Sequence, residues 1–237
     1  MPNPYFRFKQ FTVYHDRCAM KVGIDGVLLG VWSRIGKANR ILDIGTGTGL
    51  IALMLAQRSD SLIDAIDIDA EAVCQAMENV KQSPWAHRIK VNLQSLYDFA
   101  MAGTQHYDLI VSNPPYFANS LKAPSEKRTI ARHTDTLTHE DLLLHAKGLL
   151  NPEGRICIIL PRNEALHCKE YALNNGLHCT REVQVIPKPL AVPKRTLMEF
   201  SLQPGGQEEA VLVIEGNVRH EYSEEFSLLA KDFYLKL

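Results

Sequence analysis

Short apolar segments alternate with helical segments through most of the chain, and this alternation restricts the possible folds more than any other feature. Strand-like apolar runs cover residues 40–45, 62–69, 88–94, 107–113 and 155–161. Helix-like segments follow at 50–58, 70–83, 139–150 and 164–176. Strands joined through helices pair in parallel, so the pattern predicts an α/β protein with a doubly wound, mostly parallel sheet.

Two later strand-like segments, 179–187 and 196–202, have no helix between them. Their connection, residues 188–195, is too short to cross over a sheet, so we expect an antiparallel hairpin. Residues 209–216 are a candidate for a short additional edge element. The predicted sheet is seven-stranded, with an antiparallel strand in the C-terminal hairpin, and this architecture resembles the Rossmann-like class I methyltransferases.

Composition narrows the possible functions. A chain of 237 residues suits a single α/β domain, and its formal net charge of −1 excludes a global attraction to nucleic acid. The first residues lack the apolar core of a signal peptide, and the longest clean apolar run is far shorter than the roughly 20 residues of a membrane span. Five scattered cysteines without a CxxC pair predict a cytoplasmic protein with reduced thiols. The nine histidines show no metal-binding spacing, so no metal site is expected.

The motif LDIGTGTGL predicts a strand, a glycine-rich turn and a helix. Gly45 and Gly47 allow a sharp turn close to a ligand, and Gly49 allows tight helix–strand contact. Asp43 stands at the entrance of the turn, where a carboxylate suits a cationic ligand better than the pyrophosphate of a dinucleotide. S-adenosylmethionine, with its ammonium and sulfonium groups, meets this requirement. The alternative is a tight turn that needs glycine only for its shape.

The ends of the next two strands supply further candidate cofactor contacts. Asp67 ends the second strand and is placed to accept both ribose hydroxyls of an adenosine. Asp69 competes for that role, although it is better suited to begin the following helix. Ile68 would lie near the adenine ring, and Thr46 lies within the glycine turn. Ser95 reaches the same rim, where class I methyltransferases more often have an aspartate that holds the adenine amino group.

The stretch SNPPYF, residues 112–117, ends the fourth strand with two prolines, which cannot donate to a strand ladder. Asn113 contributes a side-chain carbonyl, and Pro114 leaves its backbone carbonyl free because Pro115 follows it. Tyr116 offers a flat ring beside these two acceptors. The set suits an exocyclic amine on a nucleobase, whose two hydrogens are accepted while the ring stacks on the base. The alternative is a proline-rich strand terminator.

The pair DIGTGTG and NPPY resembles the amino-methyltransferases that act on adenine, cytosine, guanine or glutamine. Four further segments, spread over nearly the whole chain, carry a narrower resemblance: 8–32, 51–58, 82–89 and 222–237. They resemble the bacterial tRNA1(Val) (adenine(37)-N6)-methyltransferases, which modify the adenine just 3′ of the anticodon. The resemblance implies S-adenosylmethionine as methyl donor and the anticodon stem-loop region of a tRNA as substrate.

The resemblance also implies a division of the chain into an N-terminal segment that covers the cofactor, 1–36, and a Rossmann-like core, 37–237. Within the first, KVGIDG at 21–26 would pack over the methionine part of the cofactor, with Lys21 as a candidate contact. Lys21 and Asp25 fit a solvated loop and a helix cap equally well.

Local charge favours an RNA partner. Residues 117–133 hold four bases against one acid, and the hairpin 188–195 holds three bases and no acid. Both segments should leave the carboxyl ends of strands, border the pocket and contact phosphates. The candidate RNA-binding residues are Phe117, Lys122, Lys127, Arg128, Arg132, Lys188, Lys194 and Arg195. A generic solvated loop is the usual alternative for either charge run.

These features predict an enzyme that methylates an adenine amino group in tRNA, with no membrane association and no obligate protein partner. The same chemistry on a guanine of ribosomal RNA, or on a glutamine amide of a protein, is the nearest alternative. A glutamine site should lack the basic rim. A binding module without catalysis leaves Asn113 and Tyr116 without a purpose, and the glycine spacing disfavours a dehydrogenase.

Overall fold

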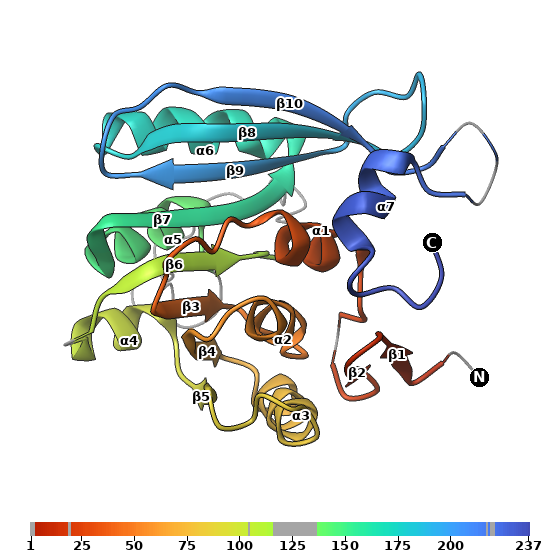
Figure 1. Cartoon of the computed structure of the whole chain (residues 1–237). Helices are drawn as coiled ribbons and strands as arrows, with labels where there is room; N and C mark the ends of the chain where they lie inside the picture. The colour runs from red at the N-terminus through yellow and green to blue at the C-terminus, as the bar shows by residue number, and fades with distance from the viewer. Residues whose placement is uncertain (1–2, 19, 104, 116–136, 217, 219–220) are drawn as a thin grey trace, which may run out of the picture.

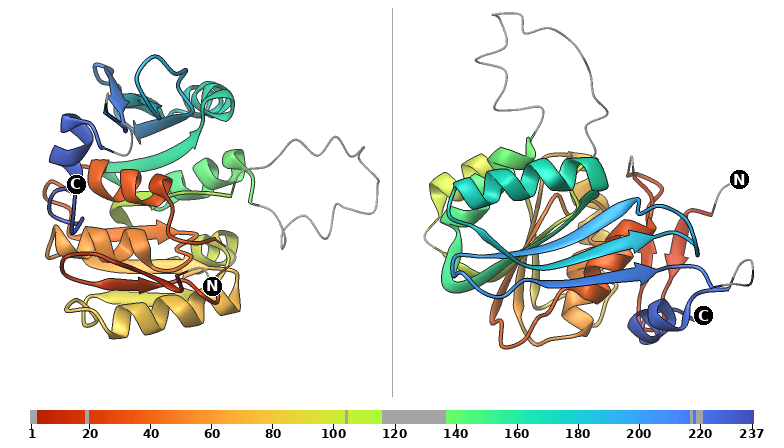
Figure 2. Two further views of the ribbon diagram at one scale, coloured as in Figure 1. Left: turned by 90° about the vertical axis from the view of Figure 1, so that its right-hand side faces the viewer. Right: turned by 90° about the horizontal axis from the view of Figure 1, so that it is seen from above.

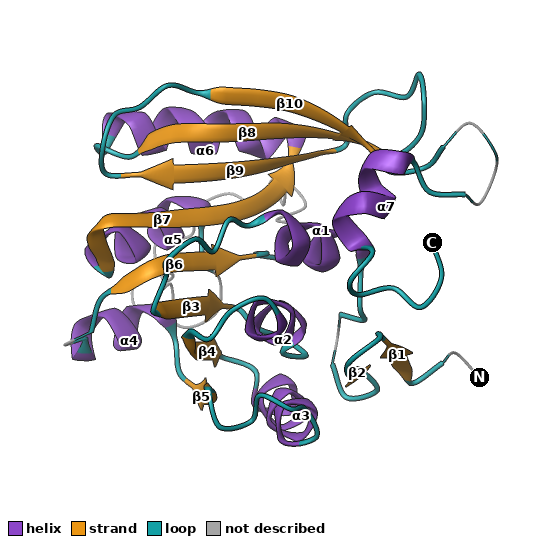
Figure 3. Ribbon diagram, in the orientation of Figure 1, coloured by secondary structure: helices purple, strands orange, loops and turns teal. Residues whose placement is uncertain are grey.

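A central sheet with helices on both faces forms the core of the computed structural model, which describes residues 3–18, 20–103, 105–115, 137–216, 218 and 221–237 (Figures 1 and 3). Within these residues the sheet has eight strands: β3 (Arg40–Ile44), β4 (Leu62–Asp67), β5 (Ile89–Leu93), β6 (Tyr107–Ser112), β7 (Leu150–Pro161), β8 (His178–Ile186), β9 (Arg195–Ser201) and β10 (Glu208–Val213). The helices are α1 (Ile24–Trp32), α2 (Leu50–Gln57), α3 (Ala70–Lys81), α4 (Leu96–Ala102), α5 (His139–Gly148), α6 (Arg162–Asn174) and α7 (Glu224–Ala230).

The strand order is β10-β8-β9-β7-β6-β3-β4-β5, and β9 runs antiparallel to both of its neighbours. The predicted doubly wound α/β sheet and its antiparallel hairpin are therefore confirmed. The sheet has one strand more than the seven predicted, because β10 pairs in parallel along the edge of β8. Most residues of β10 are exposed, so the strand carries little of the apolar pattern from which buried strands are recognised.

Helices cover both faces of the sheet (Figure 2), and an apolar cluster of buried side chains lies on each face. Helices α1, α2, α3 and α7 pack on one face, and α4, α5 and α6 pack on the other. The neighbouring residues Ile41 and Leu42 of β3 belong to opposite clusters, because side chains alternate along a strand. This burial on both sides explains why the central strands are mostly apolar in sequence, without a strict alternation of apolar and polar residues.

The N-terminal residues form a second, two-stranded sheet of β1 (Tyr5–Arg7) and β2 (Thr12–Tyr14), which the sequence did not predict. Strands of three residues are too short to show a period. The Lys9 amide donates to the Phe233 carbonyl over 2.8 Å, and Phe8 packs edge-on against Phe233. The two ends of the chain therefore pack together beside α7 (Figure 1). No helix in the described part of the chain has the length and apolar character needed to cross a bilayer.

Candidate active site

The parallel strands end at one edge of the sheet, on the right of Figure 1, and the predicted motifs meet there. Ser112, the last residue of β6, lies opposite Ile44, the last residue of β3. The Ser112 hydroxyl donates to the Ile44 carbonyl over 2.9 Å and fixes this register. Asn113 consequently leaves the sheet beside Gly45, so the two motifs that are far apart in sequence share one edge.

The glycine turn has open space above its first two glycines. Gly45 and Gly47 have φ values of 68° and 55°, and a Cβ atom built on either would meet nothing within 4 Å. A Cβ on Gly49 would lie 3.4 Å from the Cβ of Ala76, so this glycine allows close packing against α3. The amides of Gly45 and Thr46 donate to the Ile66 carbonyl of β4. The turn is thus held by the chain and leaves a cradle free for a ligand.

Asp43 lies beneath the turn and is fully buried, whereas the sequence led us to expect its carboxylate at the entrance. Its Oδ2 accepts hydrogen bonds from the Thr46 hydroxyl at 2.7 Å and the Ala52 amide at 3.2 Å. Burial raises the pKa of Asp43 to about 7 against the opposing effect of these two donors, and the Asp67 carboxylate raises it further. Asp43 therefore joins the turn to the first residues of α2, and it is not an exposed anion.

Asp67 stands at the cradle with both carboxylate oxygens oriented by backbone amides. Oδ2 accepts from Gly47 at 2.8 Å and Oδ1 from Asp69 at 3.0 Å. Each oxygen keeps a second lone pair for a ligand hydroxyl. The helix-starting role expected for Asp69 is confirmed, because its side chain caps α3 at the amides of Glu71 and Ala72. Between the two aspartates Ile68 is 56% exposed and offers an apolar surface to a planar ring.

Three other residues singled out in the sequence are Ser95, Lys21 and Asp25. Ser95 caps α4, accepting from the Asp98 amide and donating to the Asp98 carboxylate. Lys21 is exposed ahead of α1. Asp25, in the first turn of α1, accepts from Arg195 Nε at 2.9 Å and is not the cap of that helix. Arg195, an RNA-binding candidate, is accordingly paired within the protein.

The N-terminal segment approaches the Asp67 side of the cradle at Cys18. Burial raises the pKa of the Cys18 thiol to about 11, and the nearby carboxylates of Asp69 and Asp67 raise it further. Next to it, Arg17 forms an ion pair with Glu78 of α3 at 2.8 Å. This placement is compatible with the cofactor-covering role expected for residues 1–36.

A buried asparagine, which sequence reasoning missed, joins the N-terminal segment to the glycine turn. Asn79 Oδ1 accepts from the Tyr14 amide, and its Nδ2 donates to the carbonyls of Tyr14 and Thr48, each over 2.9 Å. Asn79 is 1% exposed, as is Gln75 one turn earlier on α3. Two amide side chains at i, i+4 on the apolar face of a helix are a sequence signal that could have identified this connection.

On the acceptor side, Asn113 has a buried carbonyl without a partner. No described residue donates to its Oδ1. Pro114 is buried, and no described backbone amide donates to its carbonyl. Two neighbouring acceptors that no described group uses can accept the two hydrogens of an amine. The remaining predicted residues on this side lie outside the described residues: Tyr116, Phe117, Lys122, Lys127, Arg128 and Arg132.

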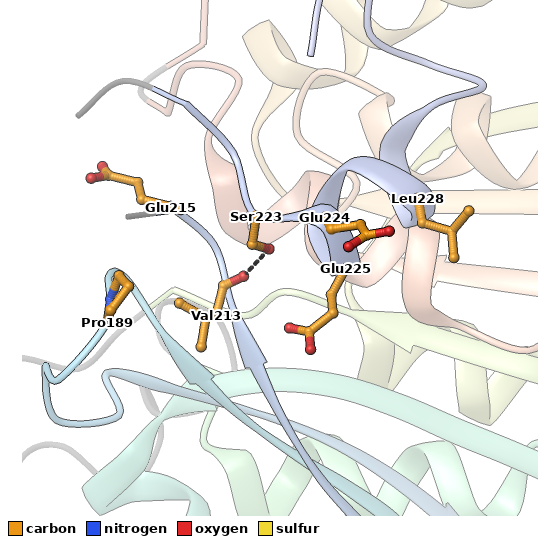
Figure 4. A pocket seen from close by; sticks show the side chains of 8 residues that line it. Pro189, Val213, Glu215, Ser223, Glu224, Glu225 and Leu228 are labelled. Atoms are coloured by element: carbon orange, nitrogen blue, oxygen red, sulfur yellow. Dashed lines mark hydrogen bonds between the residues drawn. The ribbon is translucent and has the colours of Figure 1, made fainter. Parts of the chain in front are cut away.

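A hollow of about 440 Å³ lies away from these motifs, between α7, β10 and the β8–β9 connection (Figure 4). Glu215, Glu224 and Glu225 line it together with Pro189 and Leu228. It contains none of the predicted cofactor or catalytic residues. Within the described residues, no group of three or more histidine, cysteine, aspartate or glutamate side chains is arranged to hold a metal ion.

Comparison with known proteins places these features in a family. Residues 26–185 match the family model described as "Methyltransferase small domain". A relative from Parabacteroides distasonis, named tRNA1(Val) (adenine(37)-N6)-methyltransferase, is 54% identical over 237 residues and covers 100% of both chains. A relative of the same name from Phocaeicola vulgatus is 52% identical over 237 residues, again with 100% of both chains covered.

Solved structures share the fold at low sequence identity. A crystal structure from Agrobacterium tumefaciens, described as a predicted O-methyltransferase, has a TM-score of 0.68 and 17% identity. It covers 88% of this chain and 96% of its own. The ribosomal protein L11 methylase of Lactobacillus delbrueckii has a TM-score of 0.56 and 16% identity, covering 80% and 83% of the two chains. These likenesses confirm the class I methyltransferase fold.

Proposed function

The chain belongs to the family of the tRNA1(Val) (adenine(37)-N6)-methyltransferases, and on that basis we propose that it transfers a methyl group from S-adenosylmethionine to the N6 amine of an adenine in tRNA. The acceptor is proposed to be the adenine just 3′ of the anticodon of tRNA1(Val). The observation that carries the proposal is the buried Oδ1 of Asn113, to which no described residue donates, beside the open glycine turn.

The cradle fits the proposed cofactor. Asp67 would accept the ribose hydroxyls, and the exposed Ile68 would contact the adenine ring. The open faces of Gly45 and Gly47 leave room for the methionine part. S-adenosylmethionine supplies an electrophilic methyl group on a positively charged sulfur. Asp43, Thr46 and Gly49 act indirectly, because their contacts maintain the turn.

Asn113 and Pro114 would hold the acceptor amine. The Asn113 Oδ1 and the Pro114 carbonyl accept its two hydrogens, so the nitrogen lone pair turns out of the base plane and toward the methyl carbon. The N–C bond forms as the S–C bond breaks, and one amine proton then leaves to water from the cationic nitrogen. Tyr116 is proposed to stack on the adenine, a contact worth about 1–3 kcal/mol. Positioning supplies most of the rate, and no strong base is needed.

We further propose that residues 1–237 work as one catalytic unit. The Asn79 hydrogen bonds and the Lys9–Phe233 contact attach the N-terminal segment to the core and to the C-terminal end. Removal of residues 1–20 should therefore reduce both donor binding and thermal stability.

Methylation of tRNA that lacks this modification, with labelled donor and nucleoside analysis, tests the proposed function. The expected product is labelled N6-methyladenosine in tRNA1(Val). The Asn113→Ala variant serves as the matched inactive control. Label in a methylated guanosine, in protein glutamine, or in no product at all would contradict the proposal.

A further inference from the structure

The connection between β8 and β9 exposes two apolar side chains between two lysines. Lys188, Leu190, Val192 and Lys194 are exposed, and the residues between them are half-buried. Leu190 is 105% exposed and Val192 is 62% exposed. Single exposed leucines are ordinary on protein surfaces. This pair differs because it forms the tip of a loop, between two cations, at the same edge of the sheet as Asn113.

Leu190 is also strained. The Ala191 amide donates to the Lys188 carbonyl over 3.1 Å, which makes Pro189 and Leu190 the central residues of a four-residue turn. Leu190 has a φ of 65°, and within the described residues no other non-glycine residue has a positive φ. Turns with a positive φ at this position strongly prefer glycine or asparagine, because a Cβ atom is strained there. A fully exposed leucine gains no packing within its own chain that offsets this strain.

The base of the loop is firmly held. Pro187, Pro189 and Pro193 restrict its backbone, and the Lys194 amide donates to the Val185 carbonyl over 2.9 Å. The pair between Arg195 and Asp25 ties the loop to α1. The tip is therefore presented in a fixed conformation, so less conformational entropy is lost when a partner binds than with a flexible loop.

Charge gives the two flanks of the loop different characters. Pro189 borders the hollow lined by Glu215, Glu224 and Glu225, which repels phosphate (Figure 4). Lys188 and Lys194 are exposed beside the apolar tip, and their positive charges attract phosphate. A polyanion would therefore approach the tip from the flank that faces away from α7.

We propose that the tip, residues 188–194, binds unpaired nucleotides of the substrate RNA, with Leu190 packed against a base and Lys188 and Lys194 on the adjoining phosphates. Apolar side chains that wedge against bases are an established way of holding distorted or unstacked nucleic acid. A contact between the Leu190 side chain and RNA would account for a leucine at a position that favours glycine. This inference rests on the proposed tRNA substrate, and it assigns a recognition role that the methyl-transfer chemistry does not require.

The test compares Leu190→Gly with the parent enzyme on tRNA1(Val) that lacks the modification. Glycine removes both the side chain and the strain, so thermal stability should stay equal or rise. The KM for tRNA should rise by about tenfold, as expected when one leucine side chain is no longer buried. The affinity for S-adenosylmethionine should not change. Leu173→Ala is the matched control, because Leu173 is 62% exposed in the last turn of α6, at the opposite edge of the sheet.

Leu190→Asn provides a second variant, since asparagine tolerates a positive φ but presents a polar side chain. A raised KM for tRNA in both Leu190 variants, with unchanged melting temperature and parental behaviour of Leu173→Ala, would support the inference. A parental KM in a Leu190 variant of equal or higher stability would overturn it while leaving the proposed function intact. A shift in oligomeric state on the same substitution would assign the tip to contacts between copies and would also overturn it. Failure of the parent to methylate any tRNA would be a failure of the proposed function.

Discussion

The donor side and the acceptor side of the active edge differ in how far the chain satisfies its own polar groups. On the donor side, Asp43 Oδ2, both oxygens of Asp67 and the whole Asn79 amide accept or donate hydrogen bonds within the protein. Asp43 Oδ1 is the exception on this side, because it is buried beneath the turn and no described residue donates to it. On the acceptor side, the Asn113 Oδ1 is buried without a described partner. The two sides meet where β3, which carries Asp43, pairs with β6, which leads to Asn113, and the Ser112–Ile44 bond holds these two strands in register.

The two sides have different tasks in the reaction. The methyl donor and its demethylated product share the same ribose and adenine, so both can use one preformed cradle, whose backbone is oriented once during folding. The acceptor amine needs hydrogen-bond acceptors that no protein group has claimed, because any competing donor would have to be displaced in each cycle. Substitutions on the donor side should therefore alter the affinity for S-adenosylmethionine, and substitutions on the acceptor side should alter the rate of methyl transfer.

Asn113→Ala should have the largest effect. It removes an acceptor that holds the amine in the transition state, so the rate of methyl transfer should fall by about 10²–10³-fold. Folding and donor binding should remain nearly parental. Tyr116→Phe is the companion variant, because it keeps the stacking ring and should retain much of the activity. If Asn113→Ala has the parental single-turnover rate, the proposed role of Asn113 is wrong, and the two prolines serve only to end the strand.

Asp67→Ala should weaken the binding of the methyl donor, S-adenosylmethionine. Loss of a charged acceptor for the ribose hydroxyls removes bonds worth about 1.5–3 kcal/mol, which corresponds to roughly ten- to hundredfold weaker binding of S-adenosylmethionine. Calorimetry on the purified protein measures this directly. Asp64→Ala is a control on the same strand, since Asp64 pairs with Arg40 on the part of β4 away from the cradle. An unchanged affinity in Asp67→Ala would move the ribose contact elsewhere.

Neutralising Lys127, Arg128 and Arg132 together should affect RNA and not the cofactor. The logarithm of the tRNA affinity falls with the logarithm of salt concentration, and each lost phosphate contact should reduce that slope by about one unit. Binding titrations at several salt concentrations test this, with calorimetry of the donor as the control. A triple variant with the parental salt slope would show that these side chains are not phosphate ligands.

Asn79→Ala should have a moderate effect on both stability and donor binding. It leaves the Tyr14 amide, the Tyr14 carbonyl and the Thr48 carbonyl without their partner, and an unsatisfied buried group costs about 1–3 kcal/mol. Denaturation and donor titration measure the two effects. Gln75→Ala is the matched control one turn away, since the contact between the Arg17 amide and Gln75 Oε1 is long, at 3.4 Å. Equal losses of stability and of donor affinity in the two variants would contradict the role assigned to Asn79.

Asp43→Asn should change only the pH dependence of stability. The folded pKa of Asp43, about 7, lies above the ordinary value of 3.8, so the folded state binds the proton more tightly than the unfolded state. The parent should therefore lose stability as pH rises from about 3.8 to about 7, and this contribution should be absent from the variant. If the free energy of unfolding depends on pH in the same way in the two proteins across this window, the pKa of Asp43 is not raised.

The sequence predicted the central fold well because its signals were local. Buried parallel strands are continuously apolar, and glycines and prolines mark their ends, so the regions around Gly45 and Asn113 could be recognised directly. The edge strand β10 and the short strands β1 and β2 carry little apolar periodicity, so the first was only a candidate and the others were missed.

Side-chain partners were harder to predict than side-chain positions. Asp43 was expected at the opening and lies beneath the turn, since only the three-dimensional path of residues 43–52 brings its oxygens to Thr46 and Ala52. Arg195 was expected to be free for phosphate and pairs with Asp25, which is 170 residues away in sequence. Charge runs in a sequence do not reveal such distant partners.

The single-turnover rate of methyl transfer to tRNA, measured as a function of S-adenosylmethionine concentration, tests the separation of the two sides most directly. The parent, Asn113→Ala and Asp67→Ala are compared at saturating tRNA. We expect Asn113→Ala to keep the parental half-saturating concentration and to have a maximal rate about 10²–10³-fold lower. Asp67→Ala should need roughly ten- to hundredfold more donor and then approach the parental maximal rate. If both substitutions lower the maximal rate equally, or both shift the half-saturating concentration equally, the division of the edge into a preformed donor cradle and an open acceptor site is wrong.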